Sequence, residues 1–502
     1  MNKIGIIDLG SNTTRLIVMA YEPGRCFRLV DEVSEVVRLA EGVDSNGYLQ
    51  PEPIRRAVEA LRMFESFCHG TGVQTIIAVG TSAIREAANQ DEFWAALRRA
   101  TRLNLRIISA EAEARYGYLG ATNALGLRHG FIFDTGGGST QVGAVLDRRL
   151  TEIFSVQAGV LRFTERYVRS DPVSKRDLRA LRAGARDAFA PLDWLRTAPG
   201  LTLAGIGGTV RTLARIDQKQ RAYPLDRVHG HMLTREHLAQ IVEELARRPR
   251  REREQIPGLK ADRADVTLAG AVIVEELMDR GGFRELLVSG QGVREGIFYE
   301  HFLQGSDPPL LDNPRAFSVL NLAYLSGYEQ EHCHKVAELS LSLFDQLAPL
   351  HAYGPWEREL LGYAATLHDI GVSVGYYDHH KHSEYLVHNA ALLGFTHREI
   401  ALLGFLVRNH RKGLADVTPY LSILQPDDEL RIMRLSALLR IAEYLERSKS
   451  QVVRHVRVEL GADVHVYVEA SGNADVEIWD ANRRAGLFKK AFDRDITILP
   501  TP

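Results

Sequence analysis

The sequence predicts an α/β fold, followed by an all-α region and a small α+β segment. Up to about residue 304, apolar runs such as IGIID, TIIAVG, FIFD and LTLAGIGG alternate with helical stretches, which is typical of the α/β class. Helical periodicity then dominates residues 315–447, where histidines gather between His332 and His410. The last segment contains two runs of period two, VVRHVRVEL and VHVYVEA, which predict a β-hairpin.

Individual elements follow from local signals along the chain. The apolar runs are short enough for buried strands, and the stretches at residues 53–68 and 85–100 between them have helical spacing. The Pro- and Asp-rich stretch DPPLLDNP at residues 307–314 predicts a linker. After the hairpin we expect one helix at residues 481–493 and a final strand, ITIL.

Composition places the chain among ordinary globular proteins. Of its 502 residues, 45% are hydrophobic and 25% are charged, and the formal net charge is −2. Bulk charge therefore does not indicate a nucleic-acid partner, and a polyanion site would have to be a local basic patch. Three cysteines lie far apart, which fits a reducing compartment. We find no signal peptide and no apolar stretch of about 20 residues, so we expect a cytoplasmic protein without a membrane partner.

A coarse internal duplication divides the first part of the chain. IGIIDLGSNTT and FIFDTGGGST share a strand, an aspartate, a glycine two residues later and hydroxyl side chains, and a strand–turn–strand pattern follows each. The two aspartates are Asp8 and Asp134. We therefore expect two similar lobes that face each other across a cleft. The predicted segments are residues 1–123, 124–306, 307–447 and 448–502.

The repeated loops have the chemistry of phosphate sites. A strand that ends in Asp-x-Gly-x-Ser/Thr places backbone N–H groups and hydroxyls at the carboxyl edge of a sheet, where they bind phosphate oxygens. Two tight turns with helix-capping acids are the alternative, but the second copy and a third turn, GIGGT, favour phosphate binding. Asp8 and Asp134 then lie where a divalent cation would neutralise phosphate charge. The candidate phosphate-binding residues are Gly10, Ser11, Asn12, Thr13, Arg15, Gly136, Gly137, Gly138, Ser139, Thr140, Gly207, Gly208 and Thr209.

The paired motifs D-L-G-S-N and D-x-G-G-G-S-T resemble those of the actin/hexokinase/Hsp70 superfamily. More closely, the chain resembles the exopolyphosphatase/guanosine pentaphosphatase (Ppx/GppA) family. Further matches are GTSAIREA, SAEAEARYGYLG, GIGGTVRTLA, RADVTLAG and VSGQGVREGIFYE, and similar traits continue in HKHSEYLVHN and VRNHRKG. The resemblance implies two RNase H-like lobes of the actin-like ATPase type around a cleft. An all-α HD-like domain and a small α+β domain would follow them.

The resemblance also implies an activity, the hydrolysis of the terminal phosphoanhydride of inorganic polyphosphate to release orthophosphate. The family's water-orienting glutamate precedes Ala-Arg and corresponds to Glu113, and Arg85 is a candidate phosphate clamp. From the residues alone, Glu111 and Glu113 could both be acids that favour the first turn of a helix capped by Ser109, and Arg85 a helix-surface arginine. Mg²⁺ is the expected cofactor, Mn²⁺ and a monovalent cation such as K⁺ are further candidates, and a homodimer is expected.

One residue departs from the family pattern. Family members usually carry Glu after Gly-Gly-Gly-Ser-Thr, where its carboxylate is proposed to help hold the cation, and this chain has Gln141. An amide oxygen can ligate a cation but adds no negative charge. We therefore expect weaker or altered divalent-ion binding. Loss of activity is the less expected alternative, because Asp8, Asp134 and Glu113 are all present.

The histidine-rich helical region resembles HD-type metal phosphohydrolase domains. His334, His368 and Asp369 are candidate metal ligands, and Glu443 stands where that superfamily has its last aspartate. The alternative is a relic fold whose histidines bind substrate or pack. Further residues form a basic cluster that we interpret as a polyphosphate path rather than a solvated face: Lys381, His382, Arg408, His410, Arg411 and Lys412.

Four other functions stay open. The nearest is a guanosine pentaphosphate 5′-phosphohydrolase, which applies the same chemistry to guanosine penta- or tetraphosphate. A sugar or acetate kinase of the same superfamily is the second, and a regulatory protein that binds polyphosphate or alarmone with weak turnover is the third. The fourth is an HD hydrolase in which the two lobes act as a sensor.

Overall fold

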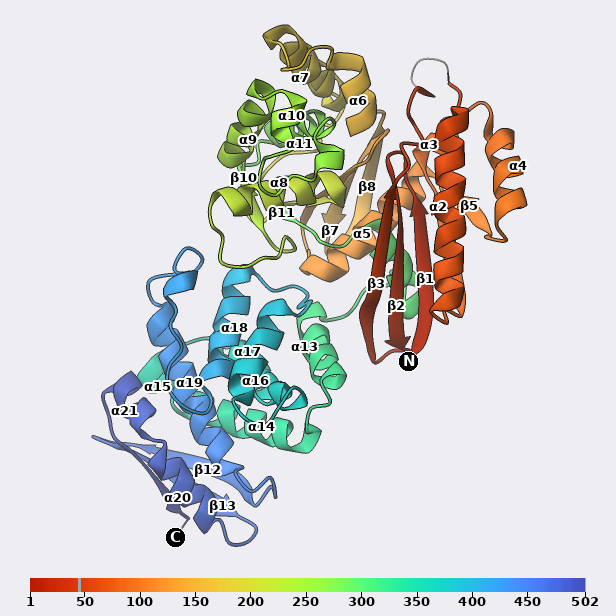
Figure 1. Cartoon of the computed structure of the whole chain (residues 1–502). Coiled ribbons are helices and arrows are strands. Elements are labelled where there is room, and N and C mark those ends of the chain that lie inside the picture. Colours follow the sequence, from red (N-terminus) through yellow and green to blue (C-terminus); the bar gives the residue numbers. More distant parts are fainter. Residues whose placement is uncertain (44–46, 502) are drawn as a thin grey trace. The chain divides into compact units, whose positions relative to one another are not determined.

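The computed structural model of the chain describes residues 1–43 and 47–501. The chain forms two compact units, residues 1–314 and 315–502 (Figure 1). The first unit contains two sheet-bearing lobes, and the second contains a helical region and a small sheet. This confirms the predicted α/β class and the two following segments.

The first lobe is built on a five-stranded sheet. Its central strand β1 is a nearly continuous apolar run, buried at every residue from Ile4 to Ile7, as expected for a strand covered on both faces. The β1 strand pairs antiparallel with β2 and parallel with β4. The strands lie in the order β3 (Cys26–Val36), β2 (Thr13–Glu22), β1 (Asn2–Leu9), β4 (Thr75–Gly80) and β5 (Leu105–Ile107).

The second lobe repeats this arrangement around a six-stranded sheet. Strand β6 pairs antiparallel with β7 and parallel with β9, as β1 does with β2 and β4. The strands lie in the order β10 (Met232–Thr234), β11 (Glu285–Val288), β9 (Thr202–Ile206), β6 (Gly130–Thr135), β7 (Thr140–Leu146) and β8 (Arg149–Val156). The duplicated sequence pattern is therefore a duplicated strand order.

The helices of the first lobe differ from the prediction in one place. Helix α2 (Pro51–Gly70) contains the helix predicted at residues 53–68 and packs on β1 and β2. The helix predicted at residues 85–100 is two helices, α3 (Ser82–Glu86) and α4 (Gln90–Ala100). The chain breaks between them because Ala87 is extended and the Asn89 amide bonds both backbone groups of Leu49, at 2.8 and 2.9 Å.

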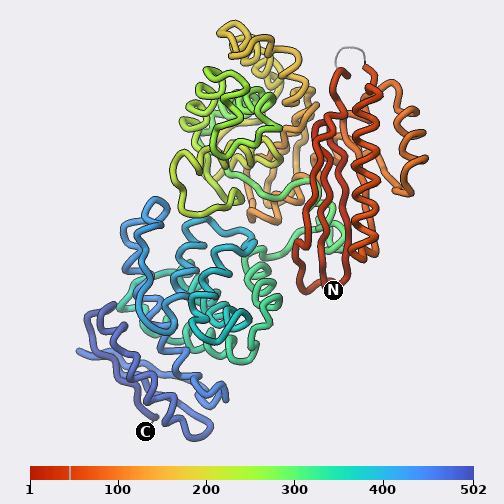
Figure 2. The backbone as a smooth tube through the Cα atoms, in the orientation of Figure 1, coloured from red at the N-terminus to blue at the C-terminus, as the bar shows by residue number. Residues whose placement is uncertain are grey.

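One helix from late in the first unit returns to the first sheet. Helix α12 (Val293–Phe302) packs on β1 and β2 and also on α5 (Ala110–Leu125), which lies on the second sheet. Figure 2 shows α12 in green beside the red strands of the first sheet. A side chain at Gly120 or Gly296 would collide with backbone atoms of the opposite helix, so these glycines permit the close approach that joins the two lobes.

The remaining helices of the first unit cover the second lobe. Helix α11 is buried along almost its whole length and packs against α7, α9, α8 and α6. These helices are α6 (Val160–Tyr167), α7 (Lys175–Phe189), α8 (Gly207–Gln220), α9 (Arg235–Arg247), α10 (Arg250–Arg253) and α11 (Thr267–Gly281).

The second unit has one hydrophobic core that joins its helices to its small sheet. Residues of that core include Leu360 and Leu403 from the helices and Val466 and Ile498 from the sheet. The helices are α13 (Pro314–Leu325), α14 (Gln330–Gln346), α15 (Ala348–His351), α16 (Pro355–Leu367), α17 (His379–Asn389), α18 (His397–Asn409) and α19 (Asp428–Leu445).

The small sheet confirms the predicted hairpin, but the helix after it differs from the prediction. Strands β12 (Val453–Leu460) and β13 (Val464–Ala470) form the hairpin, and β14 (Ile496–Pro500) pairs with β13 in parallel. The helix predicted at residues 481–493 is two helices, α20 (Asp475–Arg483) and α21 (Gly486–Phe492). The Asn482 amide bonds both backbone groups of Ile498, at 2.8 and 2.9 Å, which ties the end of α20 to β14.

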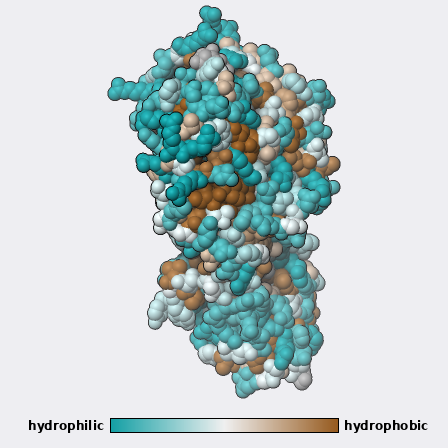
Figure 3. All heavy atoms as spheres, turned by 90° about the vertical axis from the view of Figure 1, so that its right-hand side faces the viewer, coloured by the Kyte–Doolittle hydropathy of each residue, from teal (hydrophilic) through white to brown (hydrophobic). Residues whose placement is uncertain are grey.

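Hydrophilic residues cover most of the molecular face drawn in Figure 3, with hydrophobic atoms gathered in a few patches. Among the described residues, no helix is both long enough and apolar enough to cross a membrane.

Candidate active site

The two repeated loops line one cavity in the first unit. The first loop follows β1 and the second follows β6, and both contribute to a cavity of about 120 Å³. The start of α8 adds Gly207 and Gly208. The predicted residues that line the cavity are Asp8, Gly10, Ser11, Asn12, Thr13, Arg15, Glu113, Asp134, Gly136, Gly137, Ser139, Gly207 and Gly208.

The glycines of the second loop permit its contact with the first loop. A Cβ atom on Gly137 would lie 2.9 Å from the Cβ of Ser11, and one on Gly138 would lie 3.0 Å from Ser82 Oγ. Ser11 Oγ and Ser82 Oγ are hydrogen-bonded at 2.8 Å. Consecutive glycines are therefore needed because another backbone and two hydroxyls occupy the space of their side chains.

Two partly buried carboxylates lie in this cavity. Burial raises the pKa of Asp134 to about 6, with further repulsion from Asp8, and burial also raises the pKa of Asp8. Asp8 Oδ1 is buried and has no hydrogen-bond partner among the described residues. Two desolvated carboxylates, one with an unpartnered oxygen, fit a site for a hard cation.

Glu113 reaches the cavity from the first turn of α5. Ser109 caps this helix, since its Oγ accepts a hydrogen bond from Ala112 N at 3.1 Å. Burial raises the pKa of Glu113 to about 8, against the opposing charge of Arg85, and Asp134 and Asp8 raise it further. Glu111, in the same turn, is exposed. The structure thus separates the two candidate acids: Glu113 lines the cavity and Glu111 faces solvent.

The Arg85 side chain contacts Glu113. Its Nη1 donates to the carbonyl of Ile108 at 2.8 Å and lies 3.3 Å from Glu113 Oε2. Arg85 is not among the residues that line the cavity. The predicted phosphate clamp is therefore in contact with the candidate water-orienting group.

Four arginines crowd the same cavity. Burial, and after it repulsion from Arg211, Arg294 and Arg263, lower the pKa of Arg15 to about 9. Burial also lowers the pKa of Arg263 to about 10, and Arg263 Nε has no hydrogen-bond partner among the described residues. Such a group of guanidiniums is complementary to a ligand with several negative charges.

Sequence reasoning singled out Arg15 and missed Arg211, Arg263 and Arg294. They come from α8, from the segment before α11 and from α12, so only the tertiary fold brings them together. Only a weak sequence signal pointed to these three arginines. Each of the three lies within or at the edge of a motif, GIGGTVRTLA, RADVTLAG or VSGQGVREGIFYE, but no local pattern marks the arginine itself.

A second cavity of about 270 Å³ shares residues with the first. Arg15, Arg211 and Arg263 line both cavities, and Arg215 and Lys260 line only the second. The acidic residues in its lining are Glu32 and Asp262. No aromatic residue is found among the described residues that line either cavity. The two cavities therefore share a wall of positive charge.

Besides Arg85, four residues predicted for this site lie outside the cavity lining. Thr140 Oγ1 donates to the Ala158 carbonyl at 2.5 Å, and Thr209 Oγ1 donates to the Thr135 carbonyl at 3.3 Å, so both hydroxyls brace neighbouring backbone. Gly138 is covered by Ser82. Gln141 pairs with Asp134 across β6 and β7, is buried, and donates from Nε2 to Ser139 Oγ at 2.9 Å.

In the second unit, the histidine cluster corrects one predicted ligand. His334 is exposed and contacts the Tyr328 hydroxyl at 3.3 Å, whereas His332 is buried and groups with His368, Asp369 and Glu443. Positions two apart on a helix point to nearly opposite sides, so only one of the two histidines can face the core.

Several residues of the basic cluster predicted in the second unit contact acidic or aromatic side chains. Lys381 is exposed and pairs with Asp378 at 3.0 Å, and Arg411 lies over the ring of Tyr376. Arg408 lies 3.6 Å from Glu384. His410 is buried, and the neighbouring Lys412 is exposed and His382 partly exposed. These residues do not all share one surface, because His410 belongs to the buried histidine cluster.

Comparison with known proteins gives a consistent result over most of the chain. A model of the Ppx/GppA phosphatase family matches residues 17–304, and a model of domain III of that family matches residues 315–472. A crystal structure of an exopolyphosphatase from Cytophaga hutchinsonii is 23% identical with a TM-score of 0.56, which shows the fold. An Aquifex aeolicus member of the Ppx/GppA family is 28% identical with a TM-score of 0.51. Each likeness covers 60% of this chain and 98% of the other.

Proposed function

The chain belongs to the Ppx/GppA phosphatase family, and we propose that it is an exopolyphosphatase that releases orthophosphate from the end of inorganic polyphosphate. The observation that carries this proposal is the crowding of Arg15, Arg211, Arg263 and Arg294 around the two phosphate loops. Burial, and after it repulsion from neighbouring arginines, lower the pKa of Arg15, Arg211 and Arg263, whereas Glu295 and Glu32 raise the pKa of Arg294 against its burial. The first three guanidiniums therefore suit a ligand with several negative charges.

Glu113 is the proposed water-orienting group. A water that donates a hydrogen bond to its carboxylate attacks the terminal phosphorus, and the bond between that phosphorus and the bridging oxygen breaks. The products are orthophosphate and a chain one phosphate shorter, and the proton of the water passes to Glu113 or to the leaving oxygen. Positioning and charge stabilisation dominate such a loose transition state, and the arginines supply the latter.

Asp8 and Asp134 are the proposed ligands of Mg²⁺. The unpartnered Asp8 Oδ1 and the raised pKa of both carboxylates support a cation between them. When bound, Mg²⁺ would neutralise charge on the phosphate oxygens. Gln141 is adjacent to Asp134 on the neighbouring strand, and its amide oxygen is the proposed weak substitute for a carboxylate.

Polyphosphate is favoured over guanosine pentaphosphate by the second cavity. A linear polyanion needs positive charge beyond its terminal phosphate, which Arg215 and Lys260 offer. A nucleotide base would be expected to meet an aromatic platform, and the described lining residues include none. Guanosine pentaphosphate 5′-phosphohydrolase activity is therefore the second candidate.

Phosphate release from long polyphosphate and from guanosine pentaphosphate, measured side by side, tests the proposal. Faster release from polyphosphate supports it. ADP formed from ATP and an acceptor would favour a kinase. Tight polyphosphate binding without phosphate release would favour the regulatory protein.

A further inference from the structure

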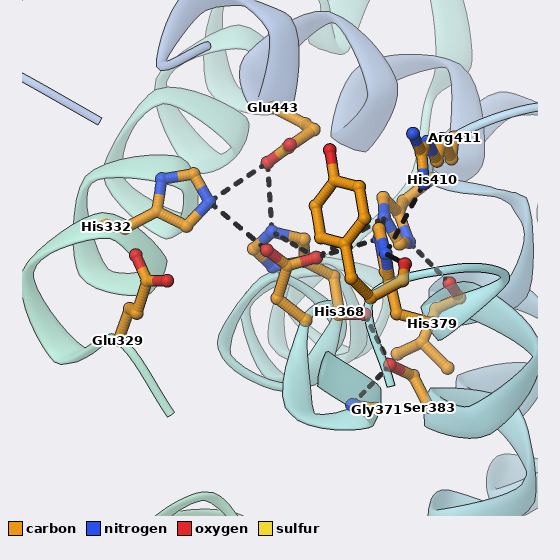
Figure 4. A network of polar contacts seen from close by, with 12 residues as sticks. Glu329, His332, His368, Gly371, His379, Ser383, His410, Arg411 and Glu443 are labelled. Carbon is orange, nitrogen blue, oxygen red and sulfur yellow. Dashed lines mark hydrogen bonds and ion pairs between the residues drawn. The ribbon is translucent and has the colours of Figure 1, made fainter. Parts of the chain in front are cut away.

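Buried histidines and carboxylates from five helical segments meet inside the second unit (Figure 4). Figure 4 shows the rings of His332 and His368 and the carboxylate of Glu443 directed toward one another, with His379 and His410 on the other side of His368. This cluster is separate from the phosphate loops of the first unit, and the proposed phosphatase mechanism does not use it. Its six members are His332, His368, Asp369, His379, His410 and Glu443.

Asp369 divides the cluster into two overlapping groups. His332, His368, Asp369 and Glu443 form one group and Asp369, His379 and His410 form the other, each with ligand atoms within 4.8 Å of one another. Asp369 Oδ2 lies 3.8 Å from His332 Nε2, while Oδ1 lies 3.2 Å from His379 Nε2 and 3.6 Å from His410 Nε2. Oδ1 also lies 3.7 Å from His368 Nε2, so the Asp369 carboxylate lies between the imidazoles of the two groups.

The spacing within the groups is that of donor atoms around an ion. Ligands held about 2.0–2.1 Å from one metal lie about 3.0–3.5 Å apart when adjacent. Glu443 Oε2 lies 3.2 Å from His332 Nε2 and 2.9 Å from His368 Nε2. His379 Nε2 and His410 Nε2 are 3.2 Å apart.

Backbone carbonyls orient three of the imidazoles. The Nδ1 atoms of His368, His379 and His410 lie 2.6, 2.9 and 2.7 Å from the carbonyl oxygens of Ala365, Tyr376 and Val407. A carbonyl only accepts, so these Nδ1 atoms carry hydrogen and the Nε2 lone pairs point into the cluster. Metal-binding histidines are held in this way.

Because the Nδ1 atoms donate to carbonyls, the Nε2 acceptors of these imidazoles face one another or face a carboxylate. In the neutral imidazoles, the Nε2 lone pairs of His379 and His410 face each other, and that of His368 faces the carboxylate of Glu443. His332 Nε2, His368 Nε2, Asp369 Oδ1 and Glu443 Oε2 are all buried without a hydrogen-bond partner among the described residues. Buried polar atoms are rarely left in this state, and a cation in each group would satisfy all of them.

We infer that the second unit holds a dinuclear metal centre in which the Asp369 carboxylate bridges two divalent ions. His332, His368 and Glu443 complete the first ion's protein ligands, and His379 and His410 complete those of the second. Imidazole-rich sites with few carboxylates suit transition metals such as Fe²⁺ and Zn²⁺ better than Mg²⁺. The centre is distinct in chemistry from the proposed all-oxygen site at Asp8 and Asp134.

Metal content of the full chain tests this inference. The protein is treated with a chelator, reloaded with Mn²⁺ or Zn²⁺ in separate samples, desalted and analysed by elemental mass spectrometry. Relative to the wild type, Asp369→Ala should lose about two ions per chain, and His332→Ala and His410→Ala about one each. His334→Ala, two residues from His332 but exposed, should lose none and serves as the matched control.

Two further readouts make the result independent of phosphatase activity. The Mn²⁺-loaded wild type should give the electron paramagnetic resonance signal of a coupled pair, which His410→Ala should convert to that of an isolated ion. Zn²⁺ should raise the melting temperature of the wild type and of His334→Ala but not of Asp369→Ala.

Equal metal content in the wild type, His332→Ala and His410→Ala would overturn the inference. Loss of the same single ion in every variant would also overturn it, because it would indicate a mononuclear site. If Asp369→Ala does not fold by circular dichroism, His332→Ala and His410→Ala decide between these outcomes.

Discussion

Arg85 Nη1 lies 3.3 Å from Glu113 Oε2, so a guanidinium anchored on the Ile108 carbonyl holds a positive charge against the carboxylate that we propose to orient the attacking water. Glu113 lines the cavity and Arg85 does not. We therefore propose that Arg85 is a positioning residue that acts on the substrate through Glu113.

Replacing Arg85 should make Glu113 harder to ionise. An opposite charge at this distance lowers the pKa of a carboxyl group by about one to three units. Arg85→Gln should therefore move the acid limb of the kcat/KM profile upward by about one unit or more. Arg85→Lys, which keeps the charge, should move it less. The same acid-limb pKa of kcat/KM in the wild type, Arg85→Gln and Arg85→Lys would show that Arg85 does not act through Glu113.

Phosphate release should rise with pH toward the alkaline range. Burial raises the pKa of Glu113 to about 8, and the group works only when it is deprotonated, so activity is lost as the pH falls below that value. More Mg²⁺ should shift the limb to lower pH, because a cation beside Asp8 and Asp134 offsets their repulsion of Glu113. A rate that is flat from about pH 6 to 9 would contradict this role for Glu113.

Gln141→Glu should raise the apparent affinity for Mg²⁺. The substitution adds a negative charge next to Asp134 on the paired strand, and we expect a roughly 3- to 10-fold lower Mg²⁺ concentration at half-maximal phosphate release. Gln74→Glu adds the same charge at the other end of the first sheet and should have no effect. An unchanged or weaker Mg²⁺ response of Gln141→Glu would show that residue 141 does not take part in Mg²⁺ binding.

Lys260→Ala should affect long chains more than short ones. Lys260 lines only the second cavity, so a chain too short to reach it loses nothing. We expect KM for long polyphosphate to rise roughly 2- to 5-fold, which corresponds to about 0.5–1 kcal/mol for an exposed ion pair. KM for triphosphate should stay constant. Lys219→Ala, an exposed lysine outside both cavities, is the control. Equal KM changes for both substrates would argue against a path through the second cavity.

Local sequence patterns were enough to predict the two lobes and their loops. A strand, an aspartate and a glycine two residues later occur within one short stretch, so both loops could be read directly from the chain. Arg211, Arg263 and Arg294 could not be predicted in this way, because segments far apart in sequence bring them to one cavity.

Helix register explains why His334 was predicted as a metal ligand in place of His332. The stretch His332-Cys333-His334 offers two histidines, and only packing decides which one faces the core. The breaks after Glu86 and Arg483 were missed for a similar reason, since the Asn89 and Asn482 amides bond backbone that is distant in sequence.

Phosphate release by wild type, Glu113→Gln and Glu111→Gln tests the central claim most directly. Long polyphosphate and guanosine pentaphosphate are assayed in parallel, and Glu111→Gln is the matched control because Glu111 is the exposed acid of the same helical turn. We predict that Glu113→Gln loses about 10²- to 10⁴-fold in kcat on both substrates and that Glu111→Gln retains wild-type rates. Unchanged turnover in Glu113→Gln would contradict the proposed active site.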